Sequence, residues 1–465
     1  MKRKIYHLIT SLLYPAVDFI AVALAILSSY KLYSILGIGK QVYYERPEIF
    51  IVSLFASFIT VIVLLGFGGY KRKSSVLNVE EIKNVIEGLT ITFMLFAVIL
   101  VFTRFSPSRY VLIFSYIFSL IFILTEKFLL YHILSSSALL KDFNKRIIIY
   151  GAGELGHALY RSIVSSPKMG IVPVGFIDDD PDKQNEFYYQ SGFNCSGGVS
   201  VLGTGKDIKR LKEELDIDEV YVAISNIDNS SLINILDYLK SKKISASFVP
   251  NLYKVLVHKV NIVKIGEIPV VTEEDGSGYS YYLHIKRYID LSLALVLLFL
   301  SLPIIGIIAL AIKMDSKGPV FFRQDRVGKN GKTFQIYKFR SMLTDTDPYS
   351  VNPSDQNDPR ITSVGKFLRK TSLDELPQII NVLKGDMSFV GPRPEMPFIV
   401  AEYDEIHKER LKVLPGITGL WQLSGDRKKA IHENMDYDLY YIRNASFFLD
   451  VAILIQTLIF AFRGI

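Results

Sequence analysis

The sequence predicts a three-part membrane protein, in which an α-helical membrane region is followed by a small α/β domain and a mostly helical third domain. Three observations predict this class. Long apolar stretches fill residues 1–140, strand and helix patterns alternate over 145–271, and another apolar stretch opens the segment 282–465. A chain of 465 residues has room for two to four folded units of ordinary size.

The composition excludes several classes of protein. Hydrophobic residues make up 50% of the chain and charged residues 21%, which excludes a disordered or fibrous chain and indicates a membrane protein. The net charge of +7 fits an anionic ligand or a lipid surface, and we expect no nucleic-acid partner because that would need a concentrated basic patch. With a single cysteine, Cys195, the chain forms neither an intramolecular disulfide nor a cysteine-based zinc cluster.

The apolar stretches in residues 1–140 predict a four-helix transmembrane region. Each is close to the roughly 20 residues that cross a hydrocarbon core of about 30 Å. They are Leu12–Leu36, Ile49–Phe67, Val85–Phe102 and Tyr110–Leu130. The first begins with polar residues such as Asp18 and lacks a small-residue cleavage site, so we expect a retained helix and not a signal peptide.

Basic residues in the flanks of these stretches predict their orientation. Lys and Arg are dense before the first stretch, between the second and third, and after the fourth. The other two connections contain fewer of them, so the tendency of basic loops to stay inside favours an even number of crossings with both ends inside. The chain after residue 140 is therefore predicted to be cytoplasmic.

A fifth apolar stretch, Ile289–Met314, differs because Pro303 lies in its middle, where it breaks or kinks a helix. Basic residues are dense on its C-terminal flank, and Lys286 and Arg287 lie on the other flank. A full crossing would place the dense basic segment outside, against the positive-inside tendency. We therefore predict a broken re-entrant helix over 289–314 that returns to the same face, with a fifth kinked span as the alternative.

Residues 145–271 predict a small Rossmann-like parallel-sheet domain. Its strands are predicted over 146–150, 172–177, 219–224 and 244–249. Gly151, Gly153 and Gly156 follow the first strand as G-x-G-x-x-G, which lets backbone N–H groups approach a phosphate. Asp178, after the second strand, could hold a ribose hydroxyl of a regulatory nucleotide. Because the domain has about half the length of a full dinucleotide fold, glycines that only turn the chain are an equal alternative.

Residues 318–426 contain the densest set of functional residue types. Arg and Lys side chains, separated by Gly and Pro turns, accompany adjacent carboxylates. Arginine forks bind phosphoryl oxygens bidentately, and carboxylates together with substrate phosphates hold Mg²⁺. This composition predicts a phosphate-handling site with a divalent cation.

Asp374 and Glu375 form the sharpest acidic pair in that segment. One interpretation is structural, because Ser372 and Glu375 match a helix capping box. Pro377 would then sit where a helical N–H is needed, so we expect the helix to start at Asp374 or Glu375 and to run to residue 384, with a glycine stop. The partial positive charge at a helix N-terminus keeps a carboxylate ionised, as a nucleophile or metal ligand requires. Capping and catalysis both remain open on this pattern alone.

From about Tyr282 to its end, the chain resembles the bacterial sugar transferases, which are monotopic polyprenyl-phosphate phosphoglycosyl transferases. The stretches that carry the resemblance are 324–328, 338–342, 371–378, 381–388 and 391–394. The larger architecture is similar to the undecaprenyl-phosphate hexose-1-phosphate transferases, for glucose or galactose, that begin O-antigen, capsule or exopolysaccharide synthesis.

In that family a UDP-sugar donates its sugar-1-phosphate to the phosphate of a membrane polyprenol, and UMP leaves. The resemblance implies that Asp374 attacks the sugar-linked phosphorus to form an acyl-phosphate, and that Glu375 helps to hold Mg²⁺. Covalent capture by a carboxylate splits one difficult step into two. Substrate or phosphate binding is assigned to Arg369, Arg393, Lys338, Arg340, Arg360 and Gln378. Lipid headgroups are equally good partners for Lys338 and Arg340.

The resemblance also implies how the catalytic domain, 282–465, meets the membrane. The family is monotopic and uses a Ser-Pro break in its re-entrant helix, whereas here Leu302 precedes Pro303 and the serine is Ser301. Expected partners are a UDP-hexose, undecaprenyl phosphate, inner-membrane lipids and a second copy of the chain. The expected location is the bacterial inner (cytoplasmic) membrane, with both soluble domains in the cytoplasm.

Two other functions stay open at this stage. A membrane-bound nucleotide-sugar dehydratase or epimerase needs a full-length cofactor domain with a well-placed Tyr-x-x-x-Lys, and it leaves Asp374 and Glu375 unexplained. The sequence has two such matches, Tyr238/Lys242 and Tyr282/Lys286, which we interpret as chance because of where they lie. The second alternative is a non-catalytic scaffold of a polysaccharide machine. No sequence feature separates one hexose from another.

Overall fold

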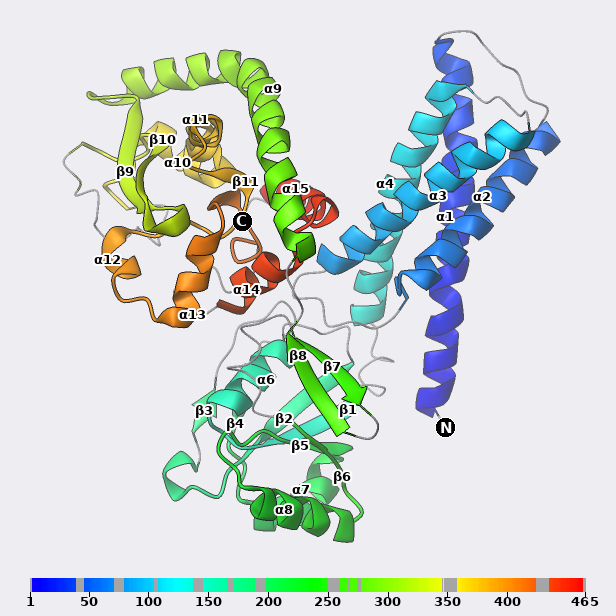
Figure 1. The fold of residues 1–465 in the computed structure, drawn as a ribbon, viewed down its shortest axis with the longest axis vertical. Helices are drawn as coiled ribbons and strands as arrows, with labels where there is room; N and C mark the ends of the chain where they lie inside the picture. Colours follow the sequence, from blue (N-terminus) through cyan, green and yellow to red (C-terminus); the bar gives the residue numbers. More distant parts are fainter. Residues whose placement is uncertain are drawn as a thin grey trace. The chain divides into compact units, whose positions relative to one another are not determined.

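The computed structural model divides into two compact units, residues 1–253 and 254–465, and each is described by itself (Figure 1). It describes residues 2–38, 46–70, 79–103, 108–136, 145–164, 170–184, 186–188, 198–249, 260–265, 268–273, 277–344, 346, 358–423 and 435–462. The described part is mostly helical, with apolar helices and a small parallel sheet.

The N-terminal region consists of long apolar helices. They are α1 (Lys2–Leu36), α2 (Arg46–Gly66), α3 (Val79–Thr103) and α4 (Arg109–Ser136). Each contains a stretch long and apolar enough to cross a membrane. Many large apolar side chains of these helices are exposed, as is expected of helices that face lipid. Lys127 Nζ lies 3.1 Å from Asp18 Oδ2, and both side chains are buried. A charged group within the membrane needs a partner of opposite charge. Asp18, near the start of the first span, therefore pairs with Lys127 of the fourth.

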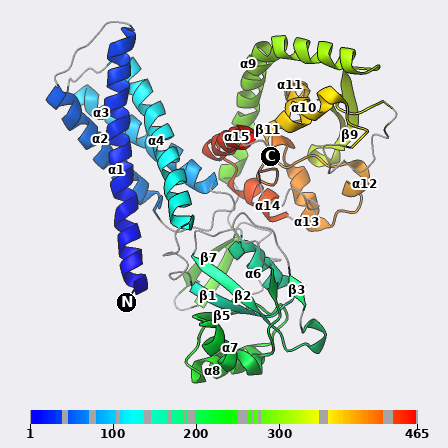
Figure 2. The ribbon, with the colours of Figure 1, turned by 180° about the vertical axis from the view of Figure 1, so that it is seen from behind.

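The middle domain is built on parallel strands in the order β2-β1-β5-β6 (Figure 2). The strands are β1 (Lys145–Tyr150), β2 (Ile171–Ile177), β5 (Glu219–Val222) and β6 (Ser245–Phe248), joined by α6 (Glu154–Val164), α7 (Ile208–Leu215) and α8 (Asn229–Ser241). Ile147, Ile148 and Ile149 are all fully buried although successive strand residues point to opposite faces, so both faces of the sheet are covered. The parallel sheet predicted from the sequence is confirmed, within a residue or two at each strand.

Shorter elements complete the middle of the chain. They are η2 (Pro181–Lys183), the paired strands β3 (Phe187–Tyr188) and β4 (Val199–Ser200), and η3 (Gly205–Asp207). The predicted domain extends to residue 271, but β7 (Val260–Ile265) and β8 (Ile268–Glu273) pair with each other and not with the parallel sheet.

The second unit contains a long helix, α9 (Ser277–Asp315), with Pro303 inside it. Figure 1 shows that α9 changes direction sharply along its length. Pro303 has no N–H for the carbonyl of Phe299, four residues earlier, and a proline in this position kinks a helix. The Ser301 hydroxyl donates to Leu298 O at 3.1 Å, so it serves a neighbouring carbonyl and not the one that the proline leaves.

The rest of this unit consists of short elements. They are β9 (Phe321–Val327), η4 (Lys329–Gly331), β10 (Thr333–Phe339), α10 (Ser363–Thr371), η5 (Leu373–Gln378), α11 (Ile379–Lys384), β11 (Ser388–Val390), α12 (Pro397–Val400), α13 (Glu405–Lys408), η6 (Glu409–Lys412), β12 (Gly416–Thr418), α14 (Met435–Asn444) and α15 (Phe447–Phe462). Among them, α10, α11, β11 and α15 contact α9. A buried cluster of Ile308, Ile312, Phe339 and Leu368 joins α9, β10 and α10. This cluster fixes the hairpin β9–β10 and the end of α10 beside η5, where the acidic pair lies.

Candidate active site

Asp374 and Glu375 lie in the first turn of a helical segment made of η5 and α11. The segment starts at Leu373 as a 3₁₀ turn, one residue before the predicted start, because Pro377 disfavours the α conformation of the residue before it. Its predicted end is confirmed, with Gly385 in the left-handed region at φ 91°. In the described part of the chain the Ser372 side chain makes no capping hydrogen bond, so the capping-box interpretation is wrong.

Glu375 is surrounded by cations. Its Oε1 accepts a hydrogen bond from Lys338 Nζ at 2.6 Å and lies 3.8 Å from Arg393 Nη2. Burial disfavours the charged form, but Lys338, Arg393 and Arg326 outweigh it and lower the pKa of Glu375 to about 2. Glu375 is therefore a permanent anion at neutral pH.

Asp374 has the opposite shift. Burial raises its pKa above the ordinary value of 3.8, and the neighbouring charge of Glu375 raises it further, against the lowering effect of Lys338 and Arg369. From the sequence, the helix N-terminus is expected to favour the ionised form of this carboxylate. Burial opposes that form more strongly, so the net result is a raised pKa. Adjacent acids whose pKa values are pushed apart are typical of a site in which the two play different chemical roles.

The other predicted site residues are in different situations. Arg369 lies in the last turn of α10 and Gln378 is buried at the end of η5. Arg360 binds Asp358 through both ends of its guanidinium, at 3.0 and 2.8 Å. Arg340 is buried and donates to the carbonyls of Lys317 and Ser316 just after α9, at 2.6 and 2.8 Å. Because these bonds use its guanidinium to hold the end of α9, Arg340 is left out of the proposed site.

Two buried side chains that the sequence did not identify hold the cationic partners of Glu375. Asn381 accepts a hydrogen bond from Tyr337 N (3.0 Å) and donates to Gln335 O (2.7 Å), so it fixes β10 beside Lys338. Asn381 belongs to one of the matching stretches of the sequence, but that membership does not identify its partner, a strand more than 40 residues away.

Arg410 does the same for Arg393. Its Nη2 donates to the Arg393 carbonyl at 3.0 Å, while its Nε lies 2.7 Å from Asp438 Oδ2, and both side chains of this ion pair are 3% exposed. Removing one member of such a pair leaves an uncompensated buried charge, so the turn that presents Arg393 is firmly held.

In the middle domain, the glycines and Asp178 come together as predicted, but their contacts are internal. A Cβ at Gly156 would lie 1.9 Å from Gly151 O, so this glycine allows close packing, whereas a Cβ at Gly153 would have open space. Asp178 Oδ2 accepts a hydrogen bond from Ala152 N at 2.8 Å. Burial opposes ionisation of Asp178, but backbone hydrogen bonds from Asp180 and Ala152, together with Lys183, lower its pKa. A loop N–H on which phosphate binding would depend is therefore already bonded to a carboxylate.

Each of the two Tyr-x-x-x-Lys matches makes contacts within its own unit. Tyr282 and Lys286 both donate to Asp450 within the second unit. Lys242, the residue that follows α8, has its Nζ 5.4 Å from the ring centroid of Tyr238 in α8. Among the described residues, no group of three or more His, Cys, Asp or Glu side chains could hold a metal ion.

Comparisons with known proteins identify relatives of the segment that contains the acidic pair. The family model described as bacterial sugar transferase matches residues 281–464, and a CoA-binding domain model matches residues 66–250. The chain is 35% identical over 335 residues to the UDP-glucose:undecaprenyl-phosphate glucose-1-phosphate transferase of Escherichia coli K12, covering 69% of this chain and 68% of that protein. It is 29% identical over 397 residues to the undecaprenyl-phosphate galactose phosphotransferase of Salmonella typhimurium, covering 81% and 80%. The galactosyl transferase CpsE of Streptococcus agalactiae is 40% identical over 226 residues, covering 43% and 49%.

Proposed function

The chain belongs to the bacterial sugar transferase family, and we propose that it transfers a hexose-1-phosphate from a UDP-sugar to undecaprenyl phosphate, releasing UMP. It is a membrane-associated transferase of the undecaprenyl-phosphate sugar phosphotransferase class. The product, undecaprenyl-diphosphate-hexose, would be the first lipid-linked intermediate of an exopolysaccharide, capsule or O-antigen. The observation that supports this best is the pair Asp374–Glu375, with opposite pKa shifts, among cations from separate elements.

In the first proposed step, an Asp374 carboxylate oxygen attacks the sugar-linked phosphorus of the UDP-sugar. A bond forms between that oxygen and the phosphorus, and the bond from the phosphorus to the oxygen of UMP breaks. The electron pair leaves with UMP, so no proton is needed. The carboxylate must be ionised to attack, and Lys338 and Arg369 favour that form against the cost of burial.

In the second step, a phosphate oxygen of undecaprenyl phosphate attacks the same phosphorus. The bond from phosphorus to Asp374 breaks, and the carboxylate is regenerated. An acyl-phosphate is an activated species, so a weak nucleophile such as a phosphate monoester can displace it. Both steps move negative charge between oxygens, and Lys338, Arg369 and Arg393 lie where they would stabilise that charge.

The acidic pair fits a magnesium ion that shares its ligands with the substrate. Mg²⁺ at phosphate sites is usually bound through one or two carboxylates, with water and substrate phosphates completing its shell. We propose that Glu375, which stays ionised at all physiological pH values, holds it. When bound, the ion would neutralise charge on the diphosphate of the donor. The diphosphate is needed for such a site, because two adjacent carboxylates alone supply too few oxygen ligands.

We further propose that α9 enters and leaves the same face of the inner membrane, so that the second unit stays cytoplasmic. The sharp change of direction in α9, the proline inside this helix and the basic residues on both flanks support this. Single cysteines at Lys317 and Lys332 should both react with an impermeant reagent from the cytoplasmic side alone. Labelling of either position from the opposite side would mean a fifth crossing.

The reaction is tested by UMP release from purified protein with undecaprenyl phosphate, Mg²⁺ and a panel of UDP-sugars. Release with one UDP-hexose, together with label from the sugar-phosphate on Asp374 in a rapid quench, is the expected result. Product formation with no protein-bound label would contradict the covalent step. No UMP release with any UDP-sugar would contradict the proposed reaction itself. The panel also identifies the hexose.

A further inference from the structure

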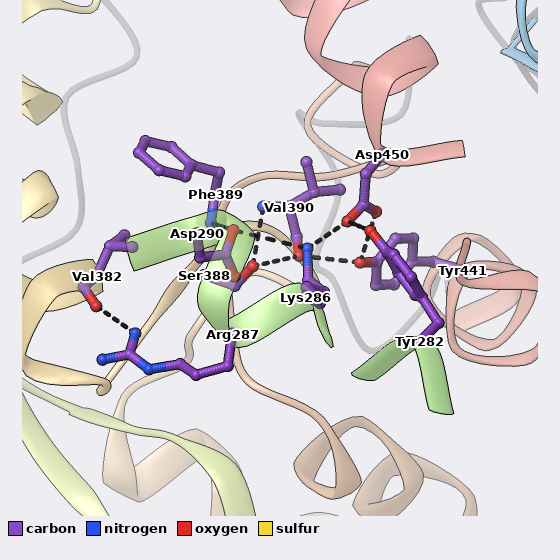
Figure 3. A network of polar contacts seen from close by, with 10 residues as sticks. All are labelled: Tyr282, Lys286, Arg287, Asp290, Val382, Ser388, Phe389, Val390, Tyr441 and Asp450. Carbon is purple, nitrogen blue, oxygen red and sulfur yellow. Dashed lines mark hydrogen bonds and ion pairs between the residues drawn. The ribbon is translucent and has the colours of Figure 1, made fainter. Parts of the chain in front are cut away.

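One turn of the membrane helix α9, residues 286–290, contacts the elements that carry the active site. Figure 3 shows that Lys286, Arg287 and Asp290 leave this turn in different directions and reach different segments of the second unit. We call residues 286–290 the anchoring turn. In the sequence, Lys286 and Arg287 lie on the flank of an apolar stretch and Asp290 lies inside that stretch.

Arg287 binds the end of the catalytic helical segment. Its Nη1 donates to Val382 O at 2.6 Å and its Nη2 donates to Leu383 O at 3.0 Å. The last carbonyls of a helix lack partners within the helix, and a cation at a helix C-terminus also interacts favourably with the helix dipole. The segment that ends here begins at η5, which carries the acidic pair.

Gly385 makes this contact possible. It follows α11 at φ 91°, and a Cβ at this position would lie 3.2 Å from Arg287 Nη2. A side chain there would press on the guanidinium. The sequence therefore leaves space for the arginine at the point where the helical segment ends.

Asp290 binds the strand that leads to Arg393. Asp290 Oδ1 accepts a hydrogen bond from Phe389 N at 3.4 Å, and Phe389 lies in β11, just before the turn that presents Arg393. Lys286 is the third charged residue of the anchoring turn. Its Nζ donates to Asp450 on α15 and lies 3.9 Å from Asp290 Oδ1. Tyr441 links the same groups, since its hydroxyl contacts both Val390 O (3.0 Å) and Asp450 Oδ1 (2.9 Å).

We propose that Arg287 is a positioning residue of the transferase reaction, which fixes the helical segment 373–384 to the membrane helix and thereby holds Asp374 in line with the lipid substrate. This role rests on the proposed function. It depends on the planar fork of arginine, because the two donors reach successive carbonyls, whereas a lysine ammonium at this position keeps the charge but not the paired geometry. Misplacement of a reacting group by about 1 Å can cost on the order of 10²-fold in rate, so a loosened segment should slow the chemical step.

The test uses the full-length protein in lipid nanodiscs, with UMP release, single-turnover labelling of Asp374 and thermal unfolding measured for each variant. Arg287→Lys should lower kcat and the rate of Asp374 labelling by about tenfold or more, with KM for the UDP-sugar within about twofold of wild type. Tyr288→Phe, at an exposed neighbour on the same helix, is the control and should behave as wild type.

A second pair of variants perturbs the same contact from the other side. Gly385→Ala should give the same loss of kcat, because its Cβ presses on Arg287. Gly331→Ala carries a comparable backbone strain at φ 75°, but its Cβ would meet open space, so it serves as the matched control and should keep full kcat. This pair keeps the proposal testable if substitution of Arg287 prevents folding.

Different failures have different meanings. Full kcat in a folded Arg287→Lys enzyme would show that only the charge matters, for example toward lipid headgroups, and would overturn the positioning role. A raised KM with unchanged kcat would place Arg287 in substrate binding and would also overturn it. Wild-type enzyme that releases no UMP from any UDP-sugar would overturn the proposed function, and the role of Arg287 with it.

Discussion

The middle domain and the second unit both have adjacent acids at the start of a helix or turn, but the partners of these acids differ. Asp178 accepts from Ala152 N, and Asp179 accepts from Gly205 N, each at 2.8 Å, so backbone groups of the same domain complete them. Asp374 and Glu375 instead face charged side chains from β10, α10 and the turn after β11. Acids completed by backbone donors stabilise a fold, whereas acids among cations leave those cations available to a phosphate.

The charge around the acids differs in the same sense. Lys338, Arg326, Arg369 and Arg393 all act on the pKa values of the acidic pair. These cations outnumber the two carboxylates, so the site has a net positive charge that a nucleotide diphosphate would neutralise. At the glycine-rich loop, Lys183 lies 3.3 Å from Asp178 and 3.8 Å from Asp180, so the one lysine is shared by two acids.

The strongest test of this comparison is to replace aspartate by asparagine in both regions. Asp374→Asn should abolish UMP release, by more than about 10³-fold, because an amide is not a competent nucleophile. Its unfolding temperature should not fall at neutral pH, since a raised folded-state pKa means that the ionised acid is disfavoured in the folded protein.

Asp178→Asn is the matched control and should show the reverse. Its activity should stay within about twofold of wild type, while its unfolding temperature falls, because a lowered folded-state pKa means that the ionised acid stabilises the domain above its ordinary pKa of 3.8. The comparison fails if Asp374→Asn retains more than a few per cent of the rate, or if Asp178→Asn inactivates a folded enzyme.

The next largest effect is expected at Glu375. Glu375→Gln should raise the Mg²⁺ concentration for half-maximal activity by about tenfold or more, because a ligand oxygen loses its charge. It should also destabilise the fold at neutral pH. The folded-state pKa of about 2 lies below the ordinary value of 4.5, so the stabilisation is present above pH 4.5 and is lost as the pH falls toward 2.

A metal titration and thermal unfolding between pH 7 and pH 3 measure both effects of Glu375→Gln. An unchanged metal titration would rule out the ligand role. Lys384→Met is a suitable control, because Lys384 Nζ contacts the Tyr337 hydroxyl at 2.7 Å and not the acidic pair.

Much of this fold follows from local patterns, but the partners of the acids do not. Short stretches of sequence determine the apolar helices, the parallel strands, the kink-forming Pro303 and the end of α11 at Gly385. Lys338 and Glu375 lie 37 residues apart, and the side chain that aligns them, Asn381, binds a strand more than 40 residues away. Residue type and spacing along the chain contain no signal for such contacts.

Arg340 shows the same limit from the other direction. Its sequence surroundings suit phosphate binding, but its guanidinium is buried against the carbonyls that follow α9. The direction of the pKa shift of Asp374 was also out of reach, because burial depends on packing between α10, β10 and η5. Residue types predicted the chemistry of the site, and tertiary contacts decide which of its cations are available.

A smaller effect is expected on the pH dependence of the reaction. Asp374 must lose its proton to attack, and its raised pKa places the acid limb of the kcat/KM profile above the ordinary 3.8. Arg369 lowers that pKa, so Arg369→Gln should move the acid limb to higher pH and reduce activity severalfold on that limb. Lys370→Gln, at the exposed neighbouring position, should leave the profile in place. An unshifted limb in Arg369→Gln would mean that Asp374 does not control it.

The smallest effect is expected at the glycine-rich loop. A Cβ at Gly153 would have open space, so Gly153→Ala keeps the fold, yet a methyl group there would obstruct a phosphate that approached the loop backbone closely. If Asp178 already serves the loop, Gly153→Ala should leave kcat and KM within about twofold of wild type, with and without added nucleotide or coenzyme A. A nucleotide that changes the rate of wild-type enzyme, and no longer does so in Gly153→Ala, would instead identify the loop as a regulatory site. In that case a phosphate of the ligand must replace the Asp178 carboxylate as the partner of Ala152 N. The two regions would then differ in what the carboxylate does. In the middle domain it would be displaced by a phosphate, whereas in the second unit it would attack a phosphorus.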